Sequence, residues 1–142
     1  MSEKSRPVSL RRQRGQEGEA LSAAFLQERG WEILERNWRP GNELRGEIDL
    51  IACDGRVLCF VEVKTRASSS HGAPQEAVTR AKQKQISALA NAYLSIHKLD
   101  ETPCRFDVIE VFLTSGAPRL VLHTNAFDYL PPGSGRRAGQ IF

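Results

Sequence analysis

The stretch that decides the fold runs from Arg45 to Arg66 and has the sequence RGEIDLIACDGRVLCFVEVKTR. Two runs rich in apolar and β-branched residues flank Asp54-Gly55, and Asp-Gly between such runs is typical of a β-hairpin. Both runs also carry charged residues at positions where a buried strand normally has apolar ones. These are Glu47 and Asp49 in the first run, and Glu62 and Lys64 in the second.

A two-residue loop at Asp54-Gly55 places Asp49 opposite Phe60 and Glu47 opposite Glu62. Directly opposed residues, and residues two apart along one strand, share a face of the sheet. A four-residue loop keeps this arrangement, whereas a three-residue loop breaks it. The hairpin therefore predicts one face that carries three carboxylates and Lys64. Such a cluster has a net negative charge, which a divalent cation would complete.

Length and composition indicate which class of protein the chain belongs to. The chain has 142 residues, 40% of them hydrophobic and 26% charged, which indicates one soluble domain with a core of its own. A net charge of +3 and a pI of about 9.0 permit a nucleic-acid partner without requiring one. No apolar run approaches the roughly 20 residues of a membrane helix. The N-terminus lacks the apolar region of a signal peptide, so we expect no membrane association.

The three cysteines form no Cys-x-x-Cys pair; they are Cys53, Cys59 and Cys104. An odd number without metal-ligand spacing indicates small hydrophobic residues in a reducing compartment, and not a disulfide or zinc framework. We therefore expect a cytoplasmic protein.

The ends of the chain differ in composition from its middle. Residues 1–14 are basic and lack apolar periodicity, so we expect a flexible arm there, and the Pro- and Gly-rich residues 131–142 predict a flexible tail. A single domain would then occupy residues 15–130. The arm has two interpretations, a solvated terminus or a phosphate-contacting segment. The candidates for phosphate contact are Arg11, Arg12 and Arg14.

The apolar spacing after Gly18 predicts a helix that ends at Gly30. Glu19 would lie in its first turn. One interpretation is that this acid stabilises the helix dipole, and the other is that it is a fourth acid directed at the hairpin site.

The remaining elements complete an α/β domain. Residues 31–38 predict an edge strand, because charges interrupt the run, and residues 57–63 predict a central strand, because both of its faces are apolar. A helix from Pro74 to about His97 and strands at 104–113 and 119–123 follow. The predicted order is α-β-β-β-α-β-β, with a mixed central sheet flanked by helices.

Two further features lie next to the predicted site. His71 belongs to a small polar loop, which is either a plain connector or a segment that contacts substrate or transfers a proton. Basic residues cluster in the first half of the second helix, and they form either a solvated face or a phosphate-contacting surface. These residues are Arg80, Lys82 and Lys84.

The chemistry of the acids favours Mg²⁺ or Mn²⁺, because oxygen ligands without His or Cys suit hard cations. Such an ion beside a lysine suits phosphodiester hydrolysis. The lysine can orient the attacking water and stabilise the added negative charge.

Asp49, a spacer of twelve residues and then Glu62-Val63-Lys64 resemble the Asp-x(n)-Glu-x-Lys signature of restriction-endonuclease-like nucleases. A longer match resembles the YraN-type bacterial family over roughly residues 13 to 125. In the first half of the chain, this match comprises Gly18-Glu19 with the Ala-rich helix that follows, residues 46–51 and residues 60–66. In the second half, it comprises a helix that contains Lys82 or Lys84 and residues 92–94, and then residues 105–108.

The resemblance implies a single restriction-endonuclease-like domain, similar in fold to archaeal Holliday-junction resolvases. It implies metal binding by Asp49, Glu62 and the main-chain carbonyl of Val63. Lys64 would be the catalytic base or a water-orienting cation, and Glu19 a helix-borne acid of the site. Glu47 has no counterpart in the signature, and three roles stay open for it: a further metal ligand, a partner for Lys64, or an inhibitor of an empty site.

Three functions compete. The first is a Mg²⁺- or Mn²⁺-dependent endonuclease acting on DNA, including branched or otherwise structured DNA; a homodimer would suit symmetric cutting of two strands. The second is a nucleic-acid-binding module that does not cut. The third is a purely structural cluster in which Lys64 neutralises the acids. The predicted nucleic-acid contacts are Arg11, Arg12, Arg14, Arg66, Arg80, Lys82 and Lys84.

Overall fold

The structure is a computed structural model that describes residues 9–41, 43–66 and 78–131. Its elements are α1 (Leu10–Glu28), β1 (Glu32–Trp38), β2 (Ile48–Asp54), β3 (Val57–Arg66), α3 (Arg80–Ile96), β4 (Cys104–Phe112) and β5 (Arg119–Phe127). The strands form one sheet in the order β1-β2-β3-β4-β5, in which β3 and β4 are parallel and every other neighbouring pair is antiparallel. The predicted α/β class and element order are confirmed. β1 is the predicted edge strand and β3 the predicted central strand.

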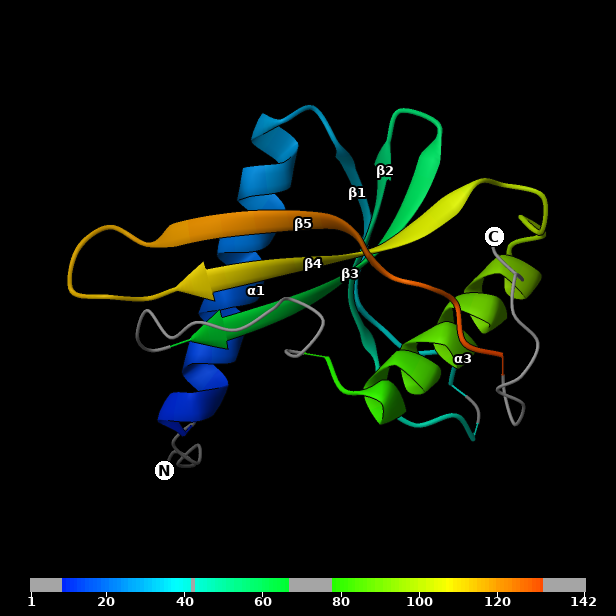
Figure 1. The fold of residues 1–142 in the computed structure, drawn as a ribbon, viewed down its shortest axis with the longest axis horizontal. Coiled ribbons are helices and arrows are strands. Elements are labelled where there is room, and N and C mark those ends of the chain that lie inside the picture. Colours follow the sequence, from blue (N-terminus) through cyan, green and yellow to red (C-terminus); the bar gives the residue numbers. More distant parts are fainter. Residues whose placement is uncertain (1–8, 42, 67–77, 132–142) are drawn as a thin grey trace, which may run out of the picture.

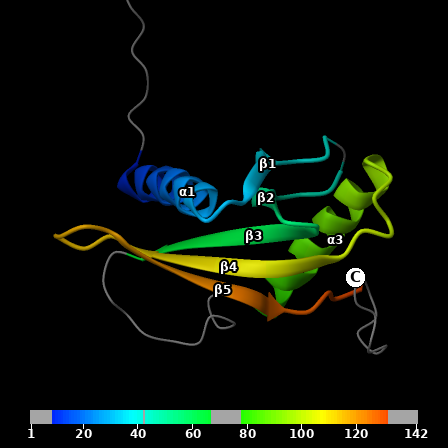
Figure 2. The same ribbon diagram turned by 90° about the horizontal axis from the view of Figure 1, so that it is seen from above.

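The two helices cover opposite faces of the sheet (Figures 1 and 2). Leu89 of α3 shares one hydrophobic core with Phe60, while Leu26 of α1 shares the other with Val61. Phe60 and Val61 are neighbours on β3, so alternate side chains of this strand enter the two cores. Burial on both faces explains why this strand is apolar at successive positions.

The β2–β3 hairpin has the predicted parity but a different register. Asp54 pairs with Val57, so the two-residue loop is Gly55-Arg56 and not Asp54-Gly55. Gly55 has a φ of +63°, which a glycine at the first loop position adopts without steric cost. Continuing this register sets Asp49 beside Glu62 and not beside Phe60. The new pairing keeps the same parity, so Asp49 stays in phase with Glu62 and Lys64. Glu47 lies before β2, outside the ladder, and contacts Asn37 and Arg39 instead of joining Glu62 and Lys64 on one face.

The first helix begins earlier than predicted. Ser9 is its N-cap, and the Ser9 hydroxyl accepts a hydrogen bond from the Arg12 backbone N–H at 3.1 Å. Residues 10–14, which we expected in the flexible arm, are therefore helical, and residues 1–8 lie outside the described residues. Glu19 lies in the middle of α1, too far from the N-terminus to act on the helix dipole.

The second helix begins later than predicted, at Arg80. Thr79 is its N-cap, and the Thr79 hydroxyl accepts a hydrogen bond from the Lys82 backbone N–H at 3.2 Å. Pro74, the predicted start, lies outside the described residues, as do His71 with its loop and the tail from residue 132. At the other end of the domain, β5 runs on to Phe127, past the predicted end at residue 123. Within the described ranges, neither helix is long and apolar enough to span a membrane.

Candidate active site

The predicted acids meet where the β2–β3 ladder ends. The ladder stops at Leu50–Val61, whereas β3 continues to Arg66. Just beyond that point, Asp49 Oδ2 accepts a hydrogen bond from the backbone N–H of Val63 at 2.8 Å. Since backbone N–H groups of a strand lie in the plane of the sheet, the Asp49 carboxylate occupies the gap between the two strands. We call this place the strand gap; side chains from both faces of the sheet can reach it.

Glu19 reaches the strand gap from α1. One carboxylate oxygen each of Glu19, Glu47 and Asp49 lies within 4.8 Å of the other two. The helix comes this close because residue 18 is a glycine: a Cβ atom there would collide with the Thr65 hydroxyl oxygen on β3. Gly18 therefore sets the approach of α1, and the residue that follows it supplies the acid.

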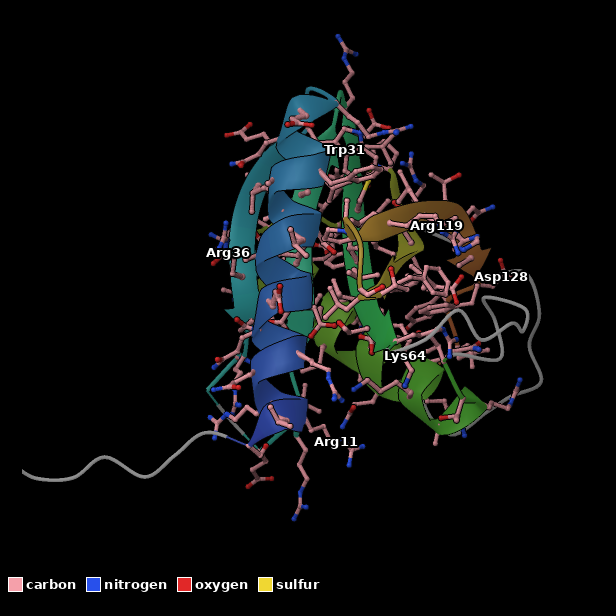
Figure 3. The ribbon with its side chains drawn as sticks, turned by 90° about the vertical axis from the view of Figure 1, so that its left-hand side faces the viewer. Arg11, Trp31, Arg36, Lys64, Arg119 and Asp128 are labelled. Carbon is pink, nitrogen blue, oxygen red and sulfur yellow. The ribbon has the colours of Figure 1, made fainter. Side chains whose placement is uncertain are left out.

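Glu62 and Lys64 approach from the other face of the sheet. They alternate along β3 in phase with Phe60, which lies in the core beneath α3. Lys82 of α3 adds a positive charge here, with its Nζ 3.9 Å from Glu62 Oε2. In Figure 3, Lys64 lies between the blue ribbon of α1 and the green ribbon of α3. The strand gap thus combines acids from three elements with cations from two.

Electrostatics favour a cation at this place. Burial, together with the neighbouring Glu62 carboxylate, raises the pKa of Asp49 to about 9, although the hydrogen bond from Val63 acts in the opposite direction. Burial also raises the pKa of Glu62, against the lowering effect of Lys82 and Lys64. A buried acid with a raised pKa holds a proton that a divalent ion can replace. The carboxylate donor set therefore fits Mg²⁺ or Mn²⁺.

Two residues that the sequence analysis did not single out complete the site on the β1 side. Asn37 Nδ2 donates to Glu19 Oε1 at 3.0 Å and to Glu47 Oε2 at 2.9 Å, and so links the two acids. Arg39 donates to Glu47 Oε1 from Nε at 3.2 Å and from a terminal nitrogen at 3.1 Å. Asn37 has a φ of +49°, which asparagine tolerates better than most residues. An asparagine at the end of an edge strand was the only sequence signal.

These contacts narrow the role of Glu47. Three roles were left open for Glu47. Pairing with Lys64 is not observed among the described residues, since the Glu47 carboxylate contacts Asn37 and Arg39. The carboxylate lies within reach of a shared ion with Asp49, so the role of a further metal ligand stays a prediction. The backbone N–H of Val63 donates to Asp49, and the Val63 carbonyl oxygen remains a predicted metal ligand.

Arginines from the first turns of α1 stand beside the acids. A cavity of about 400 Å³ is lined by Arg11, Arg14, Glu19, Glu62 and Lys64. Figure 3 shows Arg11 at the end of α1 that is nearer to Lys64. Arg11 and Arg14 thus lie beside the acids, and their contact with phosphates remains a prediction.

A second cavity lies on the β1 side of the same acids. It has a volume of about 340 Å³ and is lined by Arg12, Asn37, Arg39 and Glu47. Glu19 lines both cavities and therefore stands between them.

The profile of the Uncharacterised protein family UPF0102 matches residues 18–111. The chain belongs to this family. The UPF0102 protein of Chlorobium phaeobacteroides (strain BS1) is 50% identical over 119 residues, covering 80% of this chain and 92% of the relative. That of Chlorobium chlorochromatii (strain CaD3) is 55% identical over 97 residues, covering 68% and 72%. That of Geobacter sulfurreducens is 45% identical over 115 residues, covering 80% and 88%.

Membership of UPF0102 confirms the YraN-type resemblance at the level of the family. The matched range begins at Gly18, the residue that lets α1 approach β3, and contains all the acids of the strand gap and Lys64. Arg11 and Arg14 lie before it.

The other basic residues of this UPF0102 chain have different surroundings. Arg66 donates from Nε to Glu110 Oε2 at 2.8 Å, and Lys82 is paired with Glu62. Arg80 and Lys84 are exposed on α3. As nucleic-acid contacts all of them remain predictions, and Arg66 and Lys82 already have acidic partners within the protein.

Proposed function

We propose that the protein is a divalent-metal-dependent endonuclease that hydrolyses phosphodiester bonds of DNA, including branched or otherwise structured DNA. One observation carries the proposal: the Asp49 carboxylate occupies the strand gap within reach of Glu19, and Glu62 and Lys64 line one cavity with that acid. The order Asp49, Glu62, Lys64 resembles the restriction-endonuclease-like signature. In this proposal the domain is a relative of the archaeal Holliday-junction resolvases.

The acids of the strand gap would hold Mg²⁺ or Mn²⁺. Asp49 and Glu62 would be ligands together with the Val63 carbonyl, and Glu47 and Glu19 would supply further oxygens. When bound, such an ion would act as a Lewis acid on the phosphate and would make nearby water more acidic. Asp49 would give up its proton on binding, so metal affinity should rise with pH.

Lys64 would act on the reacting groups themselves. Lys64 lines the same cavity as Glu62, so its ammonium group would orient the attacking water and stabilise negative charge that develops on the phosphate oxygens. Arg11 and Arg14, across that cavity, would bind the phosphates next to the scissile one and fix the position of the strand.

The test is Mg²⁺-dependent cleavage of linear, nicked, flapped and four-way DNA. Asp49→Asn keeps an oxygen for the Val63 N–H but removes the charge, and Lys64→Met keeps the length of the side chain without its ammonium group. Both should abolish cleavage. Glu28→Gln changes an exposed acid at the far end of α1 and serves as the matched control. Cleavage that survives in both site variants would overturn the proposal.

A second candidate is a nucleic-acid-binding module that does not cut. The observation in its favour is that the protein's own groups already contact the acids: Asn37 and Arg39 bind Glu47, and Lys82 pairs with Glu62. This candidate predicts salt-dependent DNA binding that neither Mn²⁺ nor Asp49→Asn changes. The endonuclease predicts that both change it.

A further inference from the structure

We propose that Arg66 and His123 are positioning residues, which hold Glu110 away from Lys64 so that the Lys64 ammonium stays directed at the acids of the strand gap. The inference deepens the proposed function and rests on it for the role of Lys64. It concerns a network on β3, β4 and β5 outside the acids described above.

The register of the parallel strands sets Lys64 beside Glu110. On β3 and β4, Phe60 pairs with Phe106, Glu62 with Val108 and Lys64 with Glu110. The first pair lies in the core beneath α3, and alternation carries Lys64 and Glu110 to the same face. A lysine and a glutamate at adjacent positions on one face normally form an ion pair.

The Glu110 carboxylate is instead occupied by two other groups. Its Oε2 accepts a hydrogen bond from Arg66 Nε at 2.8 Å, and its Oε1 lies 2.9 Å from His123 Nε2. Glu110 is 6% exposed, so little water competes for these oxygens. Within the described part of the chain, no carboxylate oxygen lies within 4.0 Å of the Lys64 ammonium. Both oxygens of its closest strand neighbour are thus already bound.

Physical chemistry explains why this matters for Lys64. A buried, unpaired carboxylate would attract the nearest cation strongly, because water does not screen it. Arg66 offsets the charge of Glu110 and, with His123, fixes the direction of its oxygens. If either contact is removed, an oxygen of Glu110 becomes available to Lys64, and the lysine turns towards β4 and away from the cavity that it lines with Glu62.

The experiment compares Arg66→Met, Glu110→Gln and the double variant Arg66→Met/Glu110→Gln. Arg66→Met should lower kcat by about tenfold or more while Mn²⁺ affinity stays within about twofold of the wild type. The double variant should recover most of kcat, because the competing charge is gone. Recovery of stability alone would also restore some activity, because the double variant no longer buries an unpaired charge. Direct measurement of the Lys64 amine separates positioning from a structural role.

A second measurement does not depend on catalysis. Brief treatment with a small amine-reactive acylating reagent, followed by peptide mass spectrometry, measures the rate at which the Lys64 amine reacts. An amine in an ion pair reacts more slowly than a free one. Acylation of Lys64 should slow several-fold in Arg66→Met and return in the double variant. His123→Leu frees the other oxygen of Glu110 and should also slow acylation, so the test does not depend on one variant folding. Arg119→Met is the matched control: this β5 arginine lies over the Phe112 ring, 4.2 Å from its centroid.

The two proposals fail in different ways. If the wild type cuts no DNA but the acylation pattern appears, the endonuclease is wrong and the positioning of Lys64 stands. If Lys64 is acylated equally in the wild type, Arg66→Met and His123→Leu, the positioning inference is overturned whatever the wild type does to DNA. A double variant with no more activity than Arg66→Met would also overturn it.

Discussion

Asp49 and Val63 are joined across the end of the β2–β3 ladder by a hydrogen bond of 2.8 Å from a backbone N–H to a side-chain oxygen. The Asp49 carboxylate thus accepts the hydrogen bond that a backbone carbonyl of β2 would otherwise accept, and the β2–β3 ladder ends there. A central strand and its hydrogen-bonding geometry fix the position of this acid, and a rigid element gives a reactive group a more exact position than a loop does.

Asp49→Asn should stabilise the metal-free protein at alkaline pH. With a pKa of about 9 in the folded state and 3.8 as its ordinary value, the folded Asp49 carboxyl keeps a proton that the unfolded chain has lost. The free energy of unfolding therefore falls as pH rises from about 4 to about 9. Asparagine does not titrate, so the variant should be more stable by about 1–2 kcal/mol near pH 8 and by almost nothing near pH 4.

Urea denaturation of both proteins in the presence of a chelator, at several pH values, measures this difference. A variant that is less stable than the wild type at pH 8 would contradict the account of Asp49.

Gly18→Ala should weaken both the fold and the metal site. The added methyl group collides with the Thr65 hydroxyl, so α1 must move away from β3 and take Glu19 with it. Overpacking of this kind costs about 1–3 kcal/mol. Thr65→Ala should restore part of the stability and of the Mn²⁺ affinity, because it removes the hydroxyl oxygen from the contact.

Gly15→Ala is the control on the same helix, since nothing lies within 4 Å of a Cβ placed there. It should stabilise the protein by about 0.5–1 kcal/mol, because alanine favours helix over glycine. Thermal unfolding and Mn²⁺ titration report both effects. Equal behaviour of the two glycine variants would mean that the approach of α1 does not set the site.

Glu110→Gln should lower stability at neutral pH but not in acid. Burial alone would raise the pKa of Glu110, yet the hydrogen bonds with His123 and Arg66 lower it below the ordinary value of 4.5. A carboxyl with a lowered folded-state pKa contributes stability above its unfolded pKa and loses it as the pH falls through its folded pKa. The variant should lose about 1–3 kcal/mol at pH 7, because it weakens two charge-assisted bonds.

The difference between wild type and Glu110→Gln should shrink as the pH falls below about 4.5. Guanidinium denaturation at pH 7 and at pH 3.5 tests this. A difference that stays constant across that range would show that Glu110 does not act through its charge.

Arg11→Gln and Arg14→Gln should weaken DNA binding in a salt-dependent way. Each variant would remove one proposed phosphate contact beside the 400 Å³ cavity, so the slope of log K against log salt should become smaller by about 1. Arg29→Gln, at the opposite end of α1, should leave the slope unchanged. Fluorescence anisotropy with labelled DNA in the presence of a chelator measures binding without cleavage. Equal slopes for all three variants would remove Arg11 and Arg14 from the interface.

Local pattern was sufficient for the sheet and for the face that carries Glu62 and Lys64. The periodicity of β3 depends only on neighbours along the chain, so it placed Glu62 and Lys64 on one face although the loop lies at Gly55-Arg56. Glu47, predicted on the same face, lies with Glu19 and Asn37 instead. The first residues of the helices were predicted less well from apolar spacing. Each helix begins after an N-cap residue, Ser9 or Thr79, whose hydroxyl accepts a backbone hydrogen bond.

Long-range contacts account for what the sequence did not predict. That Asp49 lies in the plane of the sheet depends on where the β2–β3 ladder stops, which no single strand specifies. Asn37 joins Glu19 and Glu47 through a backbone with positive φ on a third element. The pairing of Arg66 with Glu110 depends on the β3–β4 register, which connects residues far apart in the sequence.

The proposed chemistry depends on a divalent ion bound in the strand gap. Anomalous diffraction from a crystal soaked in millimolar Mn²⁺ would locate that ion. We expect one strong peak within about 2.5 Å of oxygens of Asp49 and Glu62, absent from an Asp49→Asn crystal. No peak there, or a peak only at surface carboxylates away from the gap, would contradict it.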